Sequence, residues 1–382
     1  MKRLASPARP DLDRVCADLG FAFAYADDEP YWDETARYEF TLDEIERDLE
    51  AATGELWALC LELASRAVRD ERMLARLGVP EASWEAVAAS WEACEPSLYG
   101  RFDLCYGGDG PAKLLEFNGD TPTSLYEAAV FQWHWLEAGR AAGWLPHGAD
   151  QFTALHEALI ARWRKVWPDR RLHFASMDNV EDRGTVDYLA DTAVQAGRAV
   201  AVLRIGDIGL RDGRFVDLAG DPIDVLFKLY PWEWLVRDPF GRSAGMDGVR
   251  MVEPAWKMML SSKGILPLLW DLAPRHPNLL AAAFDGEAGA AALGLRWVRK
   301  PLHSREGANI AIVEDGVTTA RTGGPYGGPA VLQALHPLPD FGGMRPVVGS
   351  WIVGDRACGI GIREDAGAIT GNRSRFVPHV IL

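Results

Sequence analysis

The sequence predicts a mixed α/β (α+β) fold with mixed sheets flanked by helices. Three observations support this prediction. Residues 172–229 alternate between short apolar runs and a helical segment, which is typical of strands joined by helices. Residues 99–123 have the pattern of a β-hairpin with a Gly- and Asp-rich turn. Residues 331–363 contain short apolar runs that favour antiparallel strands.

Length and composition limit the class of protein. A chain of 382 residues exceeds one typical domain and predicts two or three packed lobes. Its net charge of −15 argues against a nucleic-acid or anionic-membrane surface. No segment is long and apolar enough to span a bilayer, and no apolar run follows the basic N-terminus as in a signal peptide. The cysteines form no C-x-x-C pair and indicate reduced thiols, so we expect a soluble cytoplasmic protein.

The first part of the chain predicts helices ahead of the hairpin. Residues 11–20 have a helical pattern. Thr41-Leu42-Asp43-Glu44 has the form of a capping box, with Thr41 as the N-cap and Glu44 three residues later. The helix that it opens is predicted to continue toward Val68, and another is predicted around Ser83–Ala93. These acidic helices are more typical of a scaffold than of a functional site.

The hairpin is predicted to gather polar side chains on one face. Side chains alternate along a strand, so Arg101 and Asp103 share a face, as do Glu116 and Asn118. A four-residue loop at 107–110 would place all four on the same face. The opposite face would then hold Phe102, Leu104, Leu115 and Phe117. Two acids and an amide supply the oxygen ligands that Mg²⁺ prefers, although a plain solvent-exposed face explains the pattern equally well.

A helix is predicted directly after the hairpin, over residues 124–140. The preceding turn, Asp120-Thr121-Pro122-Thr123, would place hydroxyls and free backbone N–H groups at the start of this helix. A helix N-terminus of this kind can bind an anion. Simple N-capping by the same hydroxyls is the alternative.

The middle of the chain predicts a sheet flanked by helices. The expected elements are a helix over 152–166, a strand over 172–177, a helix over 185–196, and strands over 199–203 and 225–229. In such sheets ligands bind beyond the carboxyl ends of the strands, where Asp178, Glu181 and Asp182 lie. Acids at this place suit a cationic or amine substrate, and helix N-capping explains one of them equally well.

The last third of the chain predicts a basic loop between two strands. One strand ends at Lys300, a Gly-containing loop follows, and a strand restarts at Asn309. Such a loop can close over phosphates and exclude water, or it can be a plain surface hairpin. Strands are then expected over 331–335, 345–353 and 358–363, with Arg363 at the end of the last. The chain has no P-loop, no dinucleotide fingerprint, no G-x-S-x-G elbow and no His-rich metal spacing.

Several of these segments together resemble a known family. They are Tyr31–Glu34, Arg101–Asp103, Glu116–Thr123, Trp256–Lys257, Lys263–Pro267 and Lys300–Ile310. In this order, from about residue 20 to the C-terminus, they resemble the synthetase part of glutathionylspermidine synthase, and most of all its stand-alone relatives, the acid–amine ligases that lack an amidase domain. The resemblance implies an ATP-grasp fold of the glutathionylspermidine synthetase type.

The same resemblance implies one multi-lobed unit over residues 1–382. Its parts are an N-terminal part with the magnesium-binding hairpin over about 1–130, a substrate-binding α/β lobe over about 131–255, and a C-terminal ATP-binding part with a lid loop over about 256–382. The lid corresponds to the loop from Pro301 to Ala308.

Matching positions then imply individual roles. The Mg²⁺ ligands would be Asp103, Glu116 and Asn118. Arg101 would contact the substrate carboxylate and the transferred phosphate, and Arg363 the phosphate or the substrate. The ATP site would also include Lys263, Lys300, Arg305 and Asn309. Thr121 and Thr123 would hold the peptide substrate, with Thr where the bifunctional enzyme has Ser. Glu181 and Asp182 resemble the acidic pair of a polyamine site, with Asp in place of the second Glu.

The function implied by the resemblance is an ATP- and Mg²⁺-dependent carboxylate–amine ligase. The γ-phosphate of ATP would convert the carboxylate to an acyl phosphate, and an amine would displace phosphate to leave an amide. The partners are then a small-molecule acid or peptide and an amine, for which glutathione and spermidine are the family's examples. Two alternatives are a nucleotide-binding regulatory protein that performs no ligation and a phosphotransferase that releases the acyl phosphate.

Overall fold

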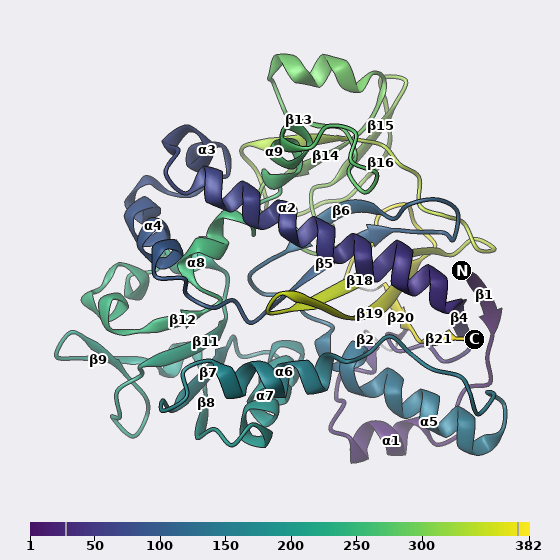
Figure 1. Ribbon diagram of the computed structural model, residues 1–382, viewed down its shortest axis with the longest axis horizontal. Helices are drawn as coiled ribbons and strands as arrows, with labels where there is room; N and C mark the ends of the chain where they lie inside the picture. Colours follow the sequence, from purple (N-terminus) through teal and green to yellow (C-terminus); the bar gives the residue numbers. More distant parts are fainter. Residues whose placement is uncertain (27–28, 373) are drawn as a thin grey trace.

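The computed structural model describes residues 1–26, 29–372 and 374–382, and its centre is a five-stranded sheet (Figure 1). The strand order is β20-β19-β18-β5-β6, and all neighbours are antiparallel. The strands are β5 (Tyr99–Cys105), β6 (Lys113–Asn118), β18 (Arg345–Val353), β19 (Arg356–Asp365) and β20 (Arg375–Val377). The predicted hairpin, β5 and β6, therefore shares one sheet with strands from the last part of the chain.

The predicted polar face of the hairpin is confirmed. Arg101 pairs with Asn118, and Asp103 pairs with Glu116. Directly paired residues of antiparallel strands point to the same side of the sheet. The four polar side chains consequently share one face.

The predicted turn and the predicted place of Leu115 are wrong. β5 ends at Cys105 and β6 begins at Lys113, so the connection is longer than the expected loop at 107–110. Beyond the Asp103–Glu116 pair the register shifts, and Leu104 pairs with Leu114. This β-bulge turns Leu114 into the core, and Leu115 lines a cavity on the polar face instead.

The long helix α2 (Ala51–Ala67) covers the apolar face of the central sheet (Figure 1). A π-helical segment, η1 (Glu44–Glu50), precedes it. The predicted capping box is confirmed, because the Thr41 N–H donates to the Glu44 carboxylate at 2.8 Å and the Glu44 N–H donates to the Thr41 hydroxyl at 3.2 Å. Trp57 of α2 lies 5.9 Å from Phe117 between ring centroids, in the largest core cluster.

The remaining N-terminal elements are short helices and strands. The helices are α1 (Leu12–Asp18), α3 (Glu71–Arg76) and α4 (Trp84–Glu92), and the short strands β2 (Tyr25–Ala26) and β3 (Glu29–Pro30) pair with each other. A separate sheet has the order β1-β4-β21, with strands β1 (Lys2–Ala5), β4 (Ala36–Phe40) and β21 (His379–Ile381). Because β21 joins β4, the two chain ends lie close together, as Figure 1 shows.

The predicted α/β segment forms a four-stranded parallel sheet with the order β12-β11-β7-β8. Its strands are β7 (Leu172–Ser176), β8 (Val200–Arg204), β11 (Val225–Leu229) and β12 (Arg250–Val252). Helix α7 (Val180–Gln195) packs on β7 and β8, α6 (Leu155–Lys165) packs on α7, and the short α8 (Trp232–Leu235) follows β11. The continuous helical segments η3 (Glu127–Phe131) and α5 (Gln132–Ala142) instead lie beside the central sheet, where η3 contacts β19. α7 begins before the predicted Thr185, so Glu181 and Asp182 lie in its first turn rather than in a loop.

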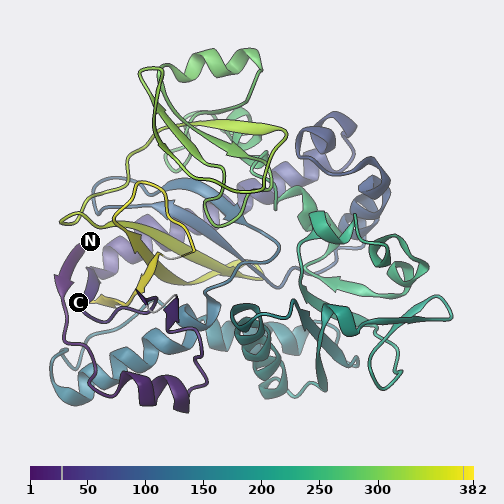
Figure 2. The same cartoon turned by 180° about the vertical axis from the view of Figure 1, so that it is seen from behind.

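A second five-stranded sheet, β13-β17-β14-β15-β16, lies above the central sheet in Figure 2, with the parallel sheet to the right. Its strands are β13 (Ala282–Phe284), β14 (Arg296–Pro301), β15 (Ala311–Glu314), β16 (Val317–Arg321) and β17 (Ala330–Ala334), and helix α9 (Ile265–Leu272) packs beside it. β15 begins two positions after the predicted Asn309. Residues 302–310 connect β14 to β15. A small hairpin, β9 (Gly209–Arg211) with β10 (Arg214–Val216), projects from the parallel sheet.

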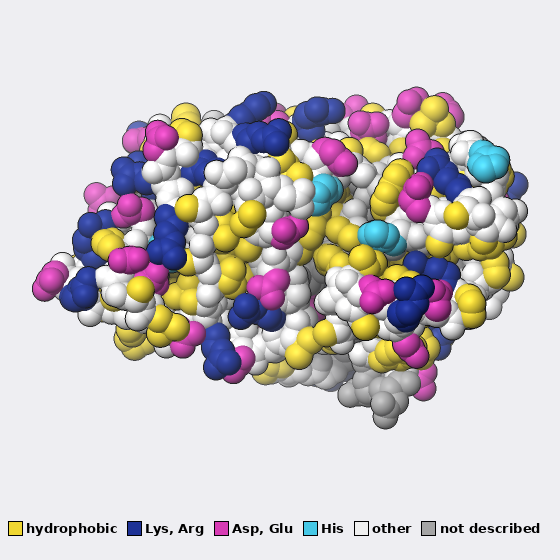
Figure 3. Space-filling model, turned by 90° about the horizontal axis from the view of Figure 1, so that it is seen from below, with side chains coloured by type: hydrophobic (Ala, Val, Ile, Leu, Met, Phe, Trp, Pro, Cys, Tyr) yellow, Lys and Arg dark blue, Asp and Glu magenta, His cyan; other side chains and the backbone are white. Residues whose placement is uncertain are grey.

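Short 3₁₀ segments complete the fold. They are η2 (Glu81–Ser83), η4 (Ile205–Asp207), η5 (Phe240–Arg242), η6 (Ala244–Gly248), η7 (Ala255–Met259) and η8 (Ala288–Leu293). Within the described ranges, no helix has the length and apolar character needed to cross a membrane. The five cysteines are all free. On the face drawn in Figure 3, Lys and Arg side chains are interspersed with Asp and Glu.

Candidate active site

A cavity of about 880 Å³ is lined by the polar face of the central sheet, by β14 and β15, and by the start of α7. Nearly all the predicted site residues line it: Arg101, Asp103, Glu116, Asn118, Thr121, Thr123, Glu181, Asp182, Lys263, Lys300, Arg305 and Arg363. The exception is Asn309. Its side-chain oxygen accepts a hydrogen bond from the Tyr326 N–H at 2.8 Å, so it supports a neighbouring loop and does not line the cavity.

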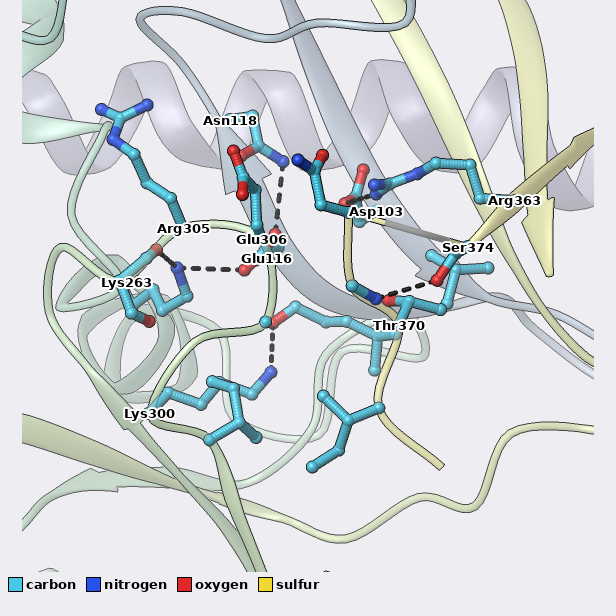
Figure 4. Close-up of a pocket in the computed structure, with 18 of the residues that line it drawn as sticks. Asp103, Glu116, Asn118, Lys263, Lys300, Arg305, Glu306, Arg363, Thr370 and Ser374 are labelled. Carbon is cyan, nitrogen blue, oxygen red and sulfur yellow. Dashed lines mark hydrogen bonds and ion pairs between the residues drawn. The ribbon is translucent and has the colours of Figure 1, made fainter. Parts of the chain in front are cut away.

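Asp103 accepts hydrogen bonds from two arginines, of which Arg363 is labelled beside it in Figure 4. Arg101 Nε donates to Oδ1 at 2.6 Å, and Arg363 Nη2 donates to Oδ2 at 2.9 Å. Burial lowers the pKa of Arg101, but the charge and hydrogen bonds of Asp103 together with the charge of Glu116 raise it overall, so the guanidinium stays charged. Gly349 makes room for this arrangement, because a Cβ there would lie 2.9 Å from Arg101 Cδ.

Glu116 lies beside two lysines (Figure 4). Lys263 Nζ is 3.1 Å from Glu116 Oε2, and Lys300 Nζ donates to the Leu115 carbonyl and to Gln333 Oε1, each at 2.8 Å. Burial alone would raise the pKa of Glu116, but the positive charges of Lys263 and Lys300 lower it to about 2. Burial also lowers the pKa of Lys300 to about 8. The carboxylate is therefore ionised near neutral pH.

The polar face offers oxygen ligands of the kind that Mg²⁺ prefers. Asp103 and Glu116 are a directly paired couple, and the Asn118 amide lies 3.5 Å from Glu116 Oε1. Two carboxylates and an amide fit the hard-ligand chemistry of Mg²⁺. Among the residues that the structure describes, no group of three or more His, Cys, Asp and Glu side chains is placed to hold a metal, so a metal here depends on the amide as well as the acids.

The loop between β14 and β15 packs across the cavity and is not a free surface hairpin. The Ser304 carbonyl accepts a hydrogen bond from Lys263 Nζ at 2.6 Å. Arg305 Nη1 donates to the Thr121 hydroxyl at 2.8 Å, and Arg305 Nη2 donates to Glu233 Oε1 at 2.7 Å. Gly307 has a φ of +68°, and a Cβ at this position would collide with the Thr370 carbonyl oxygen. Glycine thus allows the loop to approach the segment after β19.

The turn after β6 is fixed by a buried ion pair. Asp120 Oδ1 accepts from Lys228 Nζ at 2.7 Å, and its Oδ2 accepts from the Trp232 N–H at 2.8 Å. The Thr123 carbonyl accepts from Arg101 Nη1 at 2.6 Å. The Thr121 hydroxyl bonds Arg305 and does not cap the following helix, so N-capping does not account for this residue.

The first turn of α7 adds two acidic side chains, Glu181 and Asp182, to the lining of the cavity, which we call its acidic end. Asn179 is the N-cap of α7, since its side chain accepts from the Asp182 N–H at 2.8 Å. Capping consequently does not use the carboxylates of Glu181 and Asp182. Burial and the negative charges of Glu127 and Glu306 raise the pKa of Glu181 to about 7. Burial also raises the pKa of Asp182. A cation bound here would stabilise the ionised forms of both acids.

Sequence reasoning assigned no role to four residues that shape this cavity: Asp120, Glu127, Glu233 and Gln333. Asp120 lies inside the motif that contains Thr121, and that position is the only signal for it. Glu233 stands between two tryptophans in a segment far from the hairpin, and nothing in its spacing links it to Arg305. These roles arise from contacts between distant segments.

Fold and cavity together define a class of protein. The fold is mixed α/β, and the cavity has lysines, arginines and oxygen ligands at one end and acids at the other. This combination fits an enzyme that handles phosphate groups next to a cationic substrate.

The family follows from comparison with known proteins. Residues 3–382 match the family described as glutathionylspermidine synthase preATP-grasp, and the chain belongs to this family. It is 43% identical over 397 residues to a Haemophilus influenzae protein named "Putative acid--amine ligase", and the match covers 99% of each chain. It is 23% identical over 389 residues to the bifunctional glutathionylspermidine synthetase/amidase of Escherichia coli, covering 94% of this chain and 62% of that protein.

A solved structure supports the fold. The glutathione synthetase-like effector of Globodera pallida, in its apo form, is similar with a TM-score of 0.57 and 11% identity, covering 99% of this chain and 100% of the other. The expectation of an acid–amine ligase of the glutathionylspermidine synthase type, with a glutathione synthetase-like ATP-grasp fold, is therefore confirmed for family, class of enzyme and fold.

Proposed function

We propose that this protein uses ATP to join a carboxylate to an amine through an acyl-phosphate intermediate. One observation supports this most: a single cavity has a cationic end, with Arg101, Lys263, Lys300 and Arg363, and an acidic end at Glu181 and Asp182. An acyl phosphate formed at the first end would meet a cationic amine bound at the second.

The chemistry needs activation because a carboxylate has a poor leaving group. Transfer of the γ-phosphoryl group to a carboxylate oxygen breaks the bond to ADP and makes phosphate the leaving group. The amine nitrogen then attacks the acyl carbon, the C–O bond to phosphate breaks, and the nitrogen loses a proton. Positioning and neutralisation of charge supply most of the acceleration in such transfers.

The residues at the cationic end have matching tasks. Arg101 and Arg363, both held by Asp103, neutralise the reacting carboxylate and the transferred phosphate. Lys263 and Lys300 bind phosphate oxygens of the nucleotide. Asp103, Glu116 and Asn118 would hold Mg²⁺, which supplies further neutralisation of phosphate charge when bound. Asn309 supports this end from the neighbouring loop.

The acidic end would bind the amine as a cation. Glu181 and Asp182 attract the positive charge, and Thr121 and Thr123 hold the acid substrate at the middle of the cavity. The family and the Escherichia coli relative make glutathione and spermidine the first pair to test. The loop 302–310 would exclude water, which otherwise hydrolyses an acyl phosphate.

We also propose that residues 1–382 work as one multi-lobed unit. The hairpin of the N-terminal part (about 1–130) pairs with β18 of the C-terminal part (about 256–382). The acids of α7 come from the part between them (about 131–255). No one part holds all the residues that the reaction needs.

The test is ATP-dependent condensation, followed by ADP release and by mass spectrometry of the products. Glutathione and spermidine come first, and a panel of other peptides and polyamines follows. Glu116→Ala and Lys300→Ala should abolish product, whereas the exposed-site controls Glu62→Ala and Lys165→Ala should not. Unchanged ATP binding and turnover in the first two variants would disprove the site.

Two other results would redirect the function. ATP binding by calorimetry with no substrate-stimulated hydrolysis across the whole panel would indicate a nucleotide-binding regulatory protein. If hydroxylamine traps the acyl phosphate as a hydroxamate and no amide product forms, the protein would be a phosphotransferase that releases the acyl phosphate.

A further inference from the structure

One side chain of the loop 302–310 bridges two other parts of the molecule. Arg305 donates to Glu233 Oε1 from Nε at 3.2 Å and from Nη2 at 2.7 Å. Its remaining terminal nitrogen, Nη1, donates to the Thr121 hydroxyl at 2.8 Å. The ring of Trp234 lies 5.8 Å from Arg305 Cζ on another side. Glu233 belongs to α8, and Thr121 belongs to the turn after β6.

The two anchors of Arg305 are fixed relative to each other. Asp120 precedes Thr121, Trp232 precedes Glu233, and the Trp232 N–H donates to Asp120 at 2.8 Å. Lys228 pairs with the same carboxylate, and both side chains are 1% exposed. A buried bond of this kind leaves little freedom between neighbouring segments. Arg305 therefore joins the loop to a rigid frame.

The donors of Arg305 determine how the Thr121 hydroxyl can act. A guanidinium has only N–H donors, so Thr121 Oγ1 must be the acceptor in their contact. The hydroxyl hydrogen then points away from Arg305 and is available to an acceptor atom in the cavity. A carbonyl or carboxylate oxygen of an acid substrate is such an acceptor, whereas an ammonium group is not.

Glu233 also interacts electrostatically with His303, a second side chain of the same loop. Its Oε2 is buried and has no hydrogen-bond partner within the described residues, and the same holds for His303 Nδ1. Burial lowers the pKa of His303, which favours the neutral ring. Burial alone would raise the pKa of Glu233, but the charge and the hydrogen bonds of Arg305 together lower it overall. Arg305 is consequently the cation that holds Glu233 ionised.

We propose that Glu233 is a positioning residue for the ligation: it holds Arg305 so that the loop 302–310 covers the cavity and the Thr121 hydroxyl donates to an oxygen of the acid substrate. The substrate part of this inference rests on the proposed function, and the loop part rests on the contacts of Arg305 alone. Neither the family resemblance nor the sequence pattern singled out Glu233.

The loop part is tested by amide hydrogen exchange on the full chain without ligands. Glu233→Gln keeps the size of the side chain and removes its charge, so exchange over 302–310 should rise about tenfold, as expected for loss of a charge-assisted bond. The exposed pair Arg76–Glu287 provides the matched control, and Glu287→Gln should leave this loop unchanged. Exchange in Glu233→Gln equal to the wild type would overturn the proposal, because Lys263 and Gly307 would then suffice to hold the loop.

The substrate part is tested by steady-state kinetics with the acid and amine that the wild type condenses. Glu233→Gln and Thr121→Val should each raise KM for the acid about tenfold and leave KM for the amine unchanged. The double variant should be no worse than either single one, because both changes remove the same contact. Multiplied effects, or an unchanged KM in Glu233→Gln, would overturn the proposal.

The experiments distinguish failure of the proposed ligase function from failure of the role proposed for Glu233. A wild type that condenses no pair of the panel disproves the ligase function, and the exchange experiment still decides whether Glu233 holds the loop. Arg305→Lys adds a check on geometry, because lysine keeps the charge but cannot bind Glu233 and Thr121 with separate nitrogens of a rigid fork. It should resemble Glu233→Gln in both measurements.

Discussion

Lys228→Met removes the positive charge from a buried ion pair beneath the candidate active site. Lys228 Nζ lies 2.7 Å from Asp120 Oδ1, and each side chain is 1% exposed. After the change, Asp120 keeps the hydrogen bond from the Trp232 N–H, which lies 2.8 Å from Oδ2. Methionine is close to lysine in length, so the variant isolates the loss of charge from the loss of packing.

The expected cost follows from this burial. Removing one partner of a buried ion pair costs about 3–5 kcal/mol, because the remaining charge has lost its compensation. An unfolding entropy of about 2.1 cal/mol/K per residue gives roughly 0.8 kcal/mol/K for this chain, so Tm should fall by about 4–6 °C for unfolding as one unit. The double variant Lys228→Met/Asp120→Asn should recover most of this loss, since Asn still accepts the Trp232 N–H.

Thermal unfolding monitored by circular dichroism measures the effect, at one pH and one salt concentration. The exposed pair Arg66–Glu62 provides a control, and Glu62→Gln should leave Tm within about 1 °C of the wild type. The reasoning is refuted if Lys228→Met also stays within about 1 °C of the wild type. It is refuted as well if the double variant is less stable than Lys228→Met alone.

Three further predictions concern the cavity. ATP affinity should fall as the pH rises from 7 to 9, because burial lowers the pKa of Lys300 to about 8 and its ammonium form is lost above that value; calorimetry across this range measures it. KM for the amine should fall roughly tenfold from pH 6 to pH 8, because the pKa of Glu181 is raised to about 7 and its carboxylate form increases over this range; initial rates at each pH measure it. Gly307→Ala should reduce ligation at least about tenfold and lower Tm, because the new Cβ meets the Thr370 carbonyl oxygen; product formation and thermal unfolding measure it.

Each of these predictions has a matched control. Lys300→Arg stays charged at pH 9 and should abolish the pH dependence of ATP affinity, so an unchanged dependence would assign it to another group. Glu181→Gln should likewise remove the pH dependence of the amine KM, and a persistent dependence would contradict the assignment to Glu181. Gly316 also has a positive φ, of +78°, but nothing lies within 4 Å of its Cβ position. Gly316→Ala should therefore cost only backbone strain and keep activity.

The sequence predicts the parts of this site that depend on local periodicity. Strand alternation correctly places Arg101 and Asp103 on the face that also holds Glu116 and Asn118. It fails at Leu115, because a β-bulge changes the count of residues between paired positions and leaves no mark in the composition. The order of residues determines the alternation, whereas the bulge depends on how the strands pair.

Local sequence patterns do not predict contacts between segments that are far apart in the chain. Glu233 meets Arg305, and Asp120 meets Lys228, only because three sheets pack around one cavity. Asn309 shows the converse. The family resemblance implies a place for it in the ATP site, but its side-chain oxygen accepts from the Tyr326 N–H and it does not line the cavity.

The pairing of β5 with β18 has a consequence for how the protein is made. Leu104 pairs with Val348, so β5, the strand that holds Asp103, cannot pair with β18 until most of the chain has left the ribosome. At about 5–20 residues per second, this delay is on the order of ten to fifty seconds. Throughout that time β5 presents an unpaired edge, which is a template for association with other chains. The strand at the floor of the cavity is thus also a point at which nascent chains are exposed to aggregation, and folding should be slow for a protein of this size because its central contacts are so distant in sequence.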